Sequence, residues 1–163
     1  MINLLSYFSP ESVIMLQDDA YSQLMEQLVD HCLSGYSSDI RGNILAEIRS
    51  KSRSSSPQDI NLGRGFALIH AKTDEVHDIR TALGILPHPR KLLKGERIRS
   101  IFCIILPPSE SREYLSLLAR LGRMLRQKDA PKAFESASKL FRAGDSDEAR
   151  ACIMGLLQRF EQG

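Results

Sequence analysis

Gly63-Arg64-Gly65-Phe66-Ala67-Leu68-Ile69-His70-Ala71-Lys72-Thr73-Asp74 is the stretch around which the rest of the chain is organised. An apolar run leaves a glycine-rich loop and reaches a histidine, which predicts a short buried strand with an imidazole near its end. Such an imidazole is either a hydrogen-bonded structural group or a nitrogen that acts as a nucleophile or ligand. The local pattern leaves both readings open.

Helical and strand patterns alternate on both sides of this stretch. Apolar runs predict further strands at 13–16, 80–86 and 100–106. Repeats at helical spacing predict helices at 20–34 and 37–51, a third that Ser109 caps and that runs to Leu125, and a fourth after the capping-box-like pair Asp145 and Glu148. Residues 50–61 are polar and predict a loop. The alternation predicts an α/β fold in one domain, residues 1–163.

Composition excludes several classes of function. A formal net charge of +2, with no basic block rich in aromatic residues, argues against a nucleic-acid partner. No apolar run approaches the roughly 20 residues that span a bilayer, and no secretory signal opens the chain, so we expect a cytoplasmic protein. The three cysteines, Cys32, Cys103 and Cys152, stand far apart among apolar neighbours, which predicts buried reduced thiols and no metal site.

The opening stretch resembles the phosphoacceptor segment of enzyme IIA domains of the phosphotransferase system (PTS), of the fructose, mannitol and nitrogen-regulatory type (EIIA type 2). In that family the segment reads roughly glycine-x-glycine-isoleucine-alanine-isoleucine-proline-histidine-alanine-lysine-threonine. The resemblance continues in order through 82–86, 93–98, 101–107 and 114–121. It implies a mixed β-sheet with helices on both sides. The matching positions of the opening stretch are Gly63, Gly65, Ala67, His70, Ala71, Lys72 and Thr73.

The resemblance also implies a site. His70 would be the phosphoacceptor, and Arg53, Arg64, Lys72 and Tyr114 would support the phosphoryl group. No cofactor is expected, because the phosphoryl group comes from phosphoenolpyruvate through upstream carriers. The partners would be a histidine-containing phosphocarrier protein and regulatory protein targets. Such a protein is a component of a phosphotransfer chain rather than a multiple-turnover metabolic enzyme.

Two positions depart from the family pattern. Ile69 stands where the family commonly has proline before the acceptor histidine, and Tyr114 stands where it has a second site histidine. A tyrosine hydroxyl hydrogen-bonds a phosphate but cannot become a cation as imidazole does. Of the other histidines, His77 is predicted to be exposed among acidic residues, and His31 and His88 match no family position.

The leading hypothesis is a bacterial phosphocarrier most similar to the stand-alone nitrogen-regulatory enzyme IIA, because no permease or second carrier domain is attached. The alternative is a non-phosphorylated protein-interaction module on the same fold. Ile69 and Tyr114 favour that alternative.

Overall fold

A mixed β-sheet forms the centre of the molecule. The computed structural model describes residues 2–17, 19–52, 60–92 and 97–163. Within these residues the sheet has five strands in the order β1-β4-β5-β3-β2. β1 pairs with β4 and β3 with β5 in parallel, whereas β4–β5 and β2–β3 are antiparallel. The strands are Val13–Met15 (β1), Ile60–Gly63 (β2), Phe66–Lys72 (β3), Arg80–Arg90 (β4) and Ile98–Leu106 (β5).

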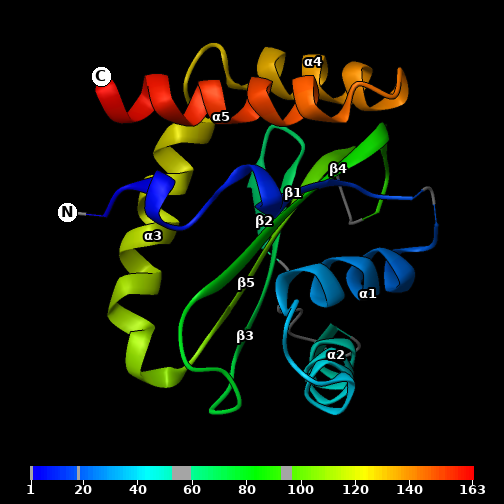
Figure 1. Cartoon of the computed structure of the whole chain (residues 1–163), viewed down its shortest axis with the longest axis vertical. Helices are drawn as coiled ribbons and strands as arrows, with labels where there is room; N and C mark the ends of the chain where they lie inside the picture. The colour runs from blue at the N-terminus through cyan, green and yellow to red at the C-terminus, as the bar shows by residue number, and fades with distance from the viewer. Residues whose placement is uncertain (1, 18, 53–59, 93–96) are drawn as a thin grey trace.

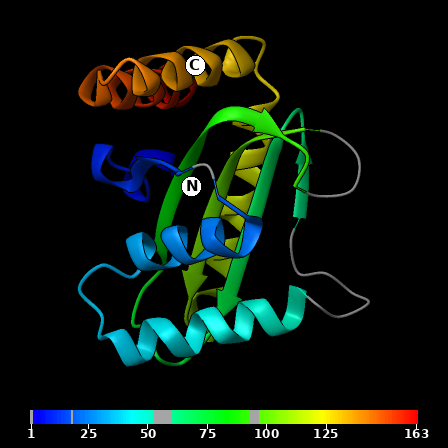
Figure 2. The same ribbon diagram turned by 90° about the vertical axis from the view of Figure 1, so that its right-hand side faces the viewer.

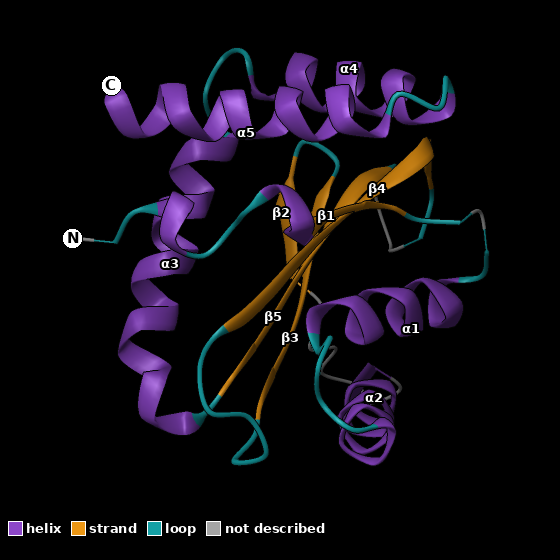
Figure 3. Cartoon of the chain, in the orientation of Figure 1, coloured by secondary structure: helices purple, strands orange, loops and turns teal. Residues whose placement is uncertain are grey.

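Helices cover both faces of this sheet, as the resemblance implied. Figures 1 and 2 show α1 and α2 on one side and α3, α4 and α5 on the other. Short 3-10 turns stand at Leu4–Ser6 (η1), Pro10–Ser12 (η2) and Pro108–Glu110 (η3). The predicted fold class, α/β with a mixed sheet between helices, is therefore confirmed (Figure 3). The helices are Tyr21–Cys32 (α1), Ser38–Ser52 (α2), Ser111–Leu125 (α3), Ala130–Arg142 (α4) and Ser146–Gln162 (α5).

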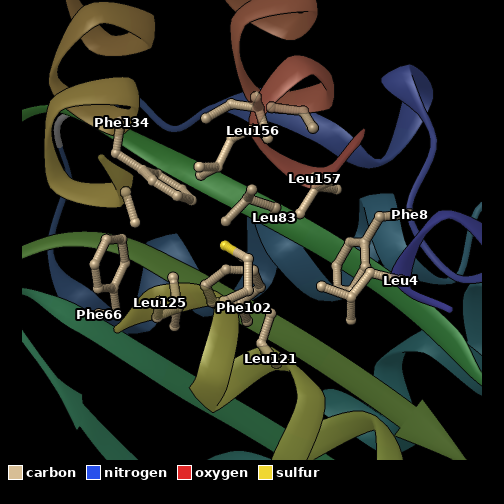
Figure 4. Packing of buried hydrophobic residues seen from close by; sticks show 14 of the residues in the cluster. Leu4, Phe8, Phe66, Leu83, Phe102, Leu121, Leu125, Phe134, Leu156 and Leu157 are labelled. Atoms are coloured by element: carbon tan, nitrogen blue, oxygen red, sulfur yellow. The ribbon is translucent and has the colours of Figure 1, made fainter. Parts of the chain in front are cut away.

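Two apolar layers hold the sheet, one on each face. Successive residues of β3 point to opposite faces, so Phe66 and Leu68 enter the layer under α3, α4 and α5, and Ala67 and Ile69 enter the layer under α1 and α2. Figure 4 shows the first layer, where the ring centroids of Phe66 and Phe134 lie 4.7 Å apart. A strand covered on both faces reads as a continuous apolar run, which explains the sequence of β5.

Several local predictions were wrong or incomplete. No element was predicted for α4, although the buried residues Ala130, Ala133, Phe134, Ala137 and Phe141 recur along it at helical spacing. β2 was likewise assigned to a loop. β4 continues past the predicted end at Leu86 to Arg90, although the pairing of β4 with β5 is irregular between Ile85 and Arg90. Most of the predicted loop at 50–61 lies outside the described residues.

Both predicted helix caps also differ from the structure. Ser109 belongs to η3, and α3 begins at Ser111, whose hydroxyl donates to the Pro108 carbonyl at 2.7 Å. The side chain of Asp145, at the N-cap of α5, makes no capping hydrogen bond. The cysteine prediction fits better, since Cys32 and Cys103 are buried free thiols and Cys152 is half-buried. None of the helices in the described ranges has the length and apolar character that crossing a bilayer requires.

Candidate functional site

The parallel pairing of β3 with β5 brings two chain segments to one end of the sheet. Because parallel strands end on the same side, the loop after β3 and the turn η3 after β5 meet there. His70 lies near this end of β3 and pairs with Ile104 of β5, which in turn pairs with Thr81 of β4. The candidate site is therefore built from both sequence segments that carry the resemblance.

The imidazole of His70 stacks on the ring of Tyr114. Their centroids lie 5.7 Å apart, and the ring planes differ by 25°. His70 is half-buried, with its Nδ1 atom shielded from solvent, so the exposed part of the ring lies elsewhere. Tyr114 is 5% exposed, and burial raises the pKa of its hydroxyl. Tyr114 therefore stays neutral at physiological pH and serves His70 as an aromatic wall.

The backbone turns sharply just beyond His70. The N–H of Thr73 donates to the Leu106 carbonyl at 2.9 Å, and the Thr73 hydroxyl accepts from the N–H of Glu75 at 3.2 Å. This side-chain bond to a nearby N–H closes a turn and ends the strand. Lys72, the last residue of β3, is exposed. Because it follows His70 by two residues, it projects from the same side of the strand.

Three carboxylates gather at the same end of the sheet. Partial loss of solvent, followed by the negative charges of Glu113 and Asp78, raises the pKa of Glu110. Asp78 belongs to the loop after β3, whereas Glu110 and Glu113 lie in η3 and at the start of α3. The end of the sheet that holds His70 therefore carries these carboxylates as well as the cation of Lys72.

The structure does not bring Arg64 to His70. Arg64 lies in the β2–β3 turn at the other end of β3, with a positive φ of 58°. Its Nη1 donates to the carbonyls of Leu125 at 2.9 Å and Gln127 at 3.2 Å, where α3 ends. Arg53 lies outside the described residues. Ile69, at the family's proline position, is fully buried on the opposite face from His70.

The remaining histidines lie apart from this pair. His77 is exposed, as predicted, and its backbone N–H donates to the Tyr36 hydroxyl at 3.2 Å. Nε2 of His31 lies within hydrogen-bonding distance of the Glu11 carbonyl, and His88 sits on β4. In the part of the chain that the structure describes, no cluster of His, Cys, Asp or Glu side chains could hold a metal ion.

Sequence reasoning placed Lys72 and Tyr114 beside His70 but did not anticipate the acidic surroundings. Glu110 and Glu113 were expected only to favour the helix N-terminus, and the family motif includes none of the three carboxylates. The sheet topology could have predicted that these carboxylates lie at the same end of the sheet. Once β3 and β5 are recognised as parallel neighbours, the loops that follow them must share one end of the sheet.

Comparison with known proteins identifies the family of the chain and finds solved structures with a similar fold. The family model described as "Phosphoenolpyruvate-dependent sugar phosphotransferase system, EIIA 2" matches residues 6–154. Among curated proteins, no sequence matches. The fold is similar to that of the nitrogen regulatory protein IIA-Ntr from Neisseria meningitidis, with a TM-score of 0.62 and 18% identity over 88% of this chain and 92% of that one. It is also similar to the mannitol-specific cryptic phosphotransferase enzyme IIA CmtB from Escherichia coli, with a TM-score of 0.71 and 14% identity over 97% and 99%.

Proposed function

Because this chain belongs to the phosphoenolpyruvate-dependent sugar phosphotransferase system EIIA 2 family, we propose that it carries a phosphoryl group on His70, received from a histidine-containing phosphocarrier protein. The observation that carries the proposal is the position of His70. It is half-buried at the end of a central strand, and the ring of Tyr114 lies against it. A rigid strand and an aromatic wall hold the imidazole in one orientation, which in-line transfer requires.

The burial of Nδ1 favours Nε2 of His70 as the acceptor. Nδ1 is shielded from solvent, so a donor protein has no direct approach to it. In the tautomer with the proton on Nδ1, the lone pair lies on Nε2. Transfer then breaks the bond between phosphorus and the donor imidazole and forms one between phosphorus and Nε2 of His70. A neutral imidazole already carries this lone pair and needs little further activation to accept the group.

The charges around His70 affect the stability of the phosphorylated state. Lys72 attracts the phosphoryl oxygens, whereas Asp78, Glu110 and Glu113 repel them. Phosphorylation adds about 1.5 to 2 negative charges at pH 7 to the end of the sheet that holds these carboxylates. We therefore expect the phosphorylated protein to lose its phosphoryl group readily and to present a strongly altered surface to a regulatory partner.

The test is phosphoryl transfer from phosphoenolpyruvate through purified enzyme I and phosphocarrier protein, followed by intact mass at neutral pH. We expect a single acid-labile phosphoryl group on the parent protein and none on a folded His70→Ala variant. Tyr114→Phe keeps the aromatic wall, so transfer to this variant should continue. His77→Ala is the matched control for removal of an imidazole, and its labelling should equal that of the parent.

A second function is favoured by Tyr114 itself. Its buried neutral hydroxyl replaces a group that can become a cation, and three carboxylates stand nearby. Both features suit a protein-interaction module on the same fold without phosphorylation. A folded parent that stays unlabelled, while a known enzyme IIA is labelled in the same reaction, would favour this second function over the first.

A further inference from the structure

A cavity lies far from His70, where β4 meets α4. It has a volume of about 220 Å³. Ile104, the strand partner of His70, lies about 17 Å along β5 from Arg99 in the cavity wall, at roughly 3.4 Å per residue. The cavity therefore belongs to neither the phosphoacceptor nor its surroundings. Its lining residues are Leu86, His88, Pro89, Arg99, Phe134, Glu135, Ser138, Lys139 and Arg142.

An interruption of the sheet creates this cavity. Ile85 pairs with Ser100 and Arg90 with Ile98, so residues 86–89 of β4 stand opposite the single residue Arg99. Pro87 and Pro89 have no N–H to donate to a neighbouring strand. The extra residues bulge away from β5 and leave a hollow between the bulge and α4.

Side chains from α4 satisfy the carbonyls that the bulge exposes. The Ser138 hydroxyl lies 3.0 Å from the Leu86 carbonyl oxygen and 2.9 Å from that of Pro87. Nη1 of Arg142 donates to the Pro87 carbonyl and, at 3.1 Å, to the Ser138 hydroxyl. These bonds fix the guanidinium of Arg142 at the cavity wall before any ligand arrives.

The cavity combines an apolar base with an excess of positive charge. Leu86 and Phe134, each 1% exposed, form the apolar part. Lys139 lies 3.3 Å from the carboxylate of Glu135, and this pair is largely exposed. Because Lys139 and Glu135 offset each other, the excess positive charge comes from Arg99 and Arg142. Nη1 of Arg99 donates to the Pro131 carbonyl at 3.0 Å. Within the described ranges, the hydrogen bonds of both guanidiniums to the protein run through Nη1, and Nη2 of each is a further N–H donor.

We propose that this cavity binds a small organic anion, with its acidic group against the two arginines and an apolar body against Leu86 and Phe134. Planar guanidiniums suit carboxylate and phosphate groups, which they bind through paired N–H donors. The volume of 220 Å³ is below the roughly 300–1,000 Å³ typical of sites for drug-sized molecules, so the ligand is small. This inference does not depend on phosphorylation of His70.

Binding can be tested on the full chain by calorimetry and by amide chemical shifts, with 3-phenylpropionate and phenyl phosphate as probes. We expect Kd values of about 0.1–1 mM, in keeping with the ligand size, and amide shifts centred on α4 and on residues 86–90. The acid that binds more tightly identifies the preferred head group. The neutral alcohol 3-phenylpropanol and inorganic phosphate alone should each bind much more weakly.

Variants separate the roles of charge and fold. Arg142→Gln should weaken binding roughly tenfold or more, because it removes a charge-assisted hydrogen bond. Lys139→Gln should weaken it a few-fold, because the Glu135 carboxylate in the cavity wall then lacks its counter-charge and repels the anion; this variant loses no structural bond other than the exposed pair itself. Lys132→Gln, also exposed on α4 but outside the cavity, is the matched control and should bind as the parent does. His70→Ala should also bind normally.

Three outcomes would overturn the proposal. The first is the absence of binding by both acids at concentrations well above 1 mM. The second is equal affinity for 3-phenylpropanol or for inorganic phosphate. The third is a set of amide shifts centred on another part of the protein. Should Arg142→Gln fail to fold, the comparison of Lys139→Gln with Lys132→Gln still decides the question.

Discussion

Gly84→Ala tests whether the contact between β4 and Leu16, the residue that follows β1, is as tight as the structure indicates. Gly84 lies in β4 between Ile14 of β1 and Ile101 of β5. A Cβ atom at this position would lie 2.6, 2.7 and 2.9 Å from Cδ1, Cγ and Cδ2 of Leu16. Real Cβ atoms essentially never approach other heavy atoms within 3.0 Å, so one side must move.

The cost follows from the burial of Leu16. Its side chain is fully buried, and its N–H donates to the Ile85 carbonyl at 2.8 Å, so neither rotation nor withdrawal relieves the contact cheaply. Overpacking of this kind costs about 1–3 kcal/mol, and the lower entropy of alanine in the unfolded chain returns about 0.4–1 kcal/mol. We expect the free energy of unfolding to fall by about 1–2 kcal/mol and Tm by roughly 2–8 °C.

Urea unfolding followed by circular dichroism measures this change. Gly42→Ala is the matched control, because a Cβ there meets nothing within 4 Å in α2 and should raise the free energy of unfolding by up to about 1 kcal/mol. Leu16→Ala alone should cost about 2–5 kcal/mol. The double variant Leu16→Ala/Gly84→Ala should lose about 1–3 kcal/mol less than the sum of the single losses. Additive losses, or an unchanged Gly84→Ala variant, would refute the reasoning.

Three further predictions concern side chains away from this contact. Burial alone would raise the pKa of Glu161, but hydrogen bonds from Arg120 and from the Leu4 N–H outweigh it and hold that pKa below 4.5. The stability that Glu161 contributes is thus present above the unfolded-state value of about 4.3 and is lost as pH falls through the lower folded-state pKa. In urea unfolding at several pH values, Glu161→Gln should be less stable than the parent at pH 7 and show a smaller acid-dependent loss; equal slopes would contradict this. Ser100→Ala should leave the free energy of unfolding unchanged or raise it by up to about 1 kcal/mol, because the fully buried Ser100 hydroxyl has no hydrogen-bond partner in the described residues; a loss above about 1 kcal/mol would indicate a partner. Arg64→Ala should lower the free energy of unfolding by about 1 kcal/mol through loss of its bonds to the end of α3, while labelling of His70 continues at the parental rate; slower labelling would place Arg64 in the phosphate site.

The sequence predicts what depends on local pattern. The run from Phe66 to Lys72 predicts β3, because residues covered on both faces must nearly all be apolar. Apolar residues at helical spacing predict α1, α2, α3 and α5, because each helix buries one face against the sheet. The ring contact of Tyr114 with His70 follows from the resemblance, since the family places a second site residue at this helix position. These elements have their determinants within a few residues of one another.

Features that depend on distant partners could not be predicted in this way. The apolar stripe of α4 recurs at helical spacing, but the elements that it packs against, α5 and β4, are not specified by that local pattern. Pro87 and Pro89 indicated an end to regular structure, yet β4 continues because bonds from α4 satisfy the exposed carbonyls. Arg64 is adjacent in sequence to the motif, but the length of β3 carries it to the far end of the sheet.

The bond between the Leu4 N–H and the carboxylate of Glu161 has a consequence for the order of folding. Synthesis begins at the N-terminus, but β1 finds its strand partner only when β4 has emerged from the ribosome. η1 can form its bond to Glu161 only later, after α5 has been synthesised. Pairings between segments so distant in sequence form slowly, since a long loop must close before the contact is gained. Although η1 is synthesised before β4 and α5, it is therefore expected to be among the last elements to acquire its native contacts.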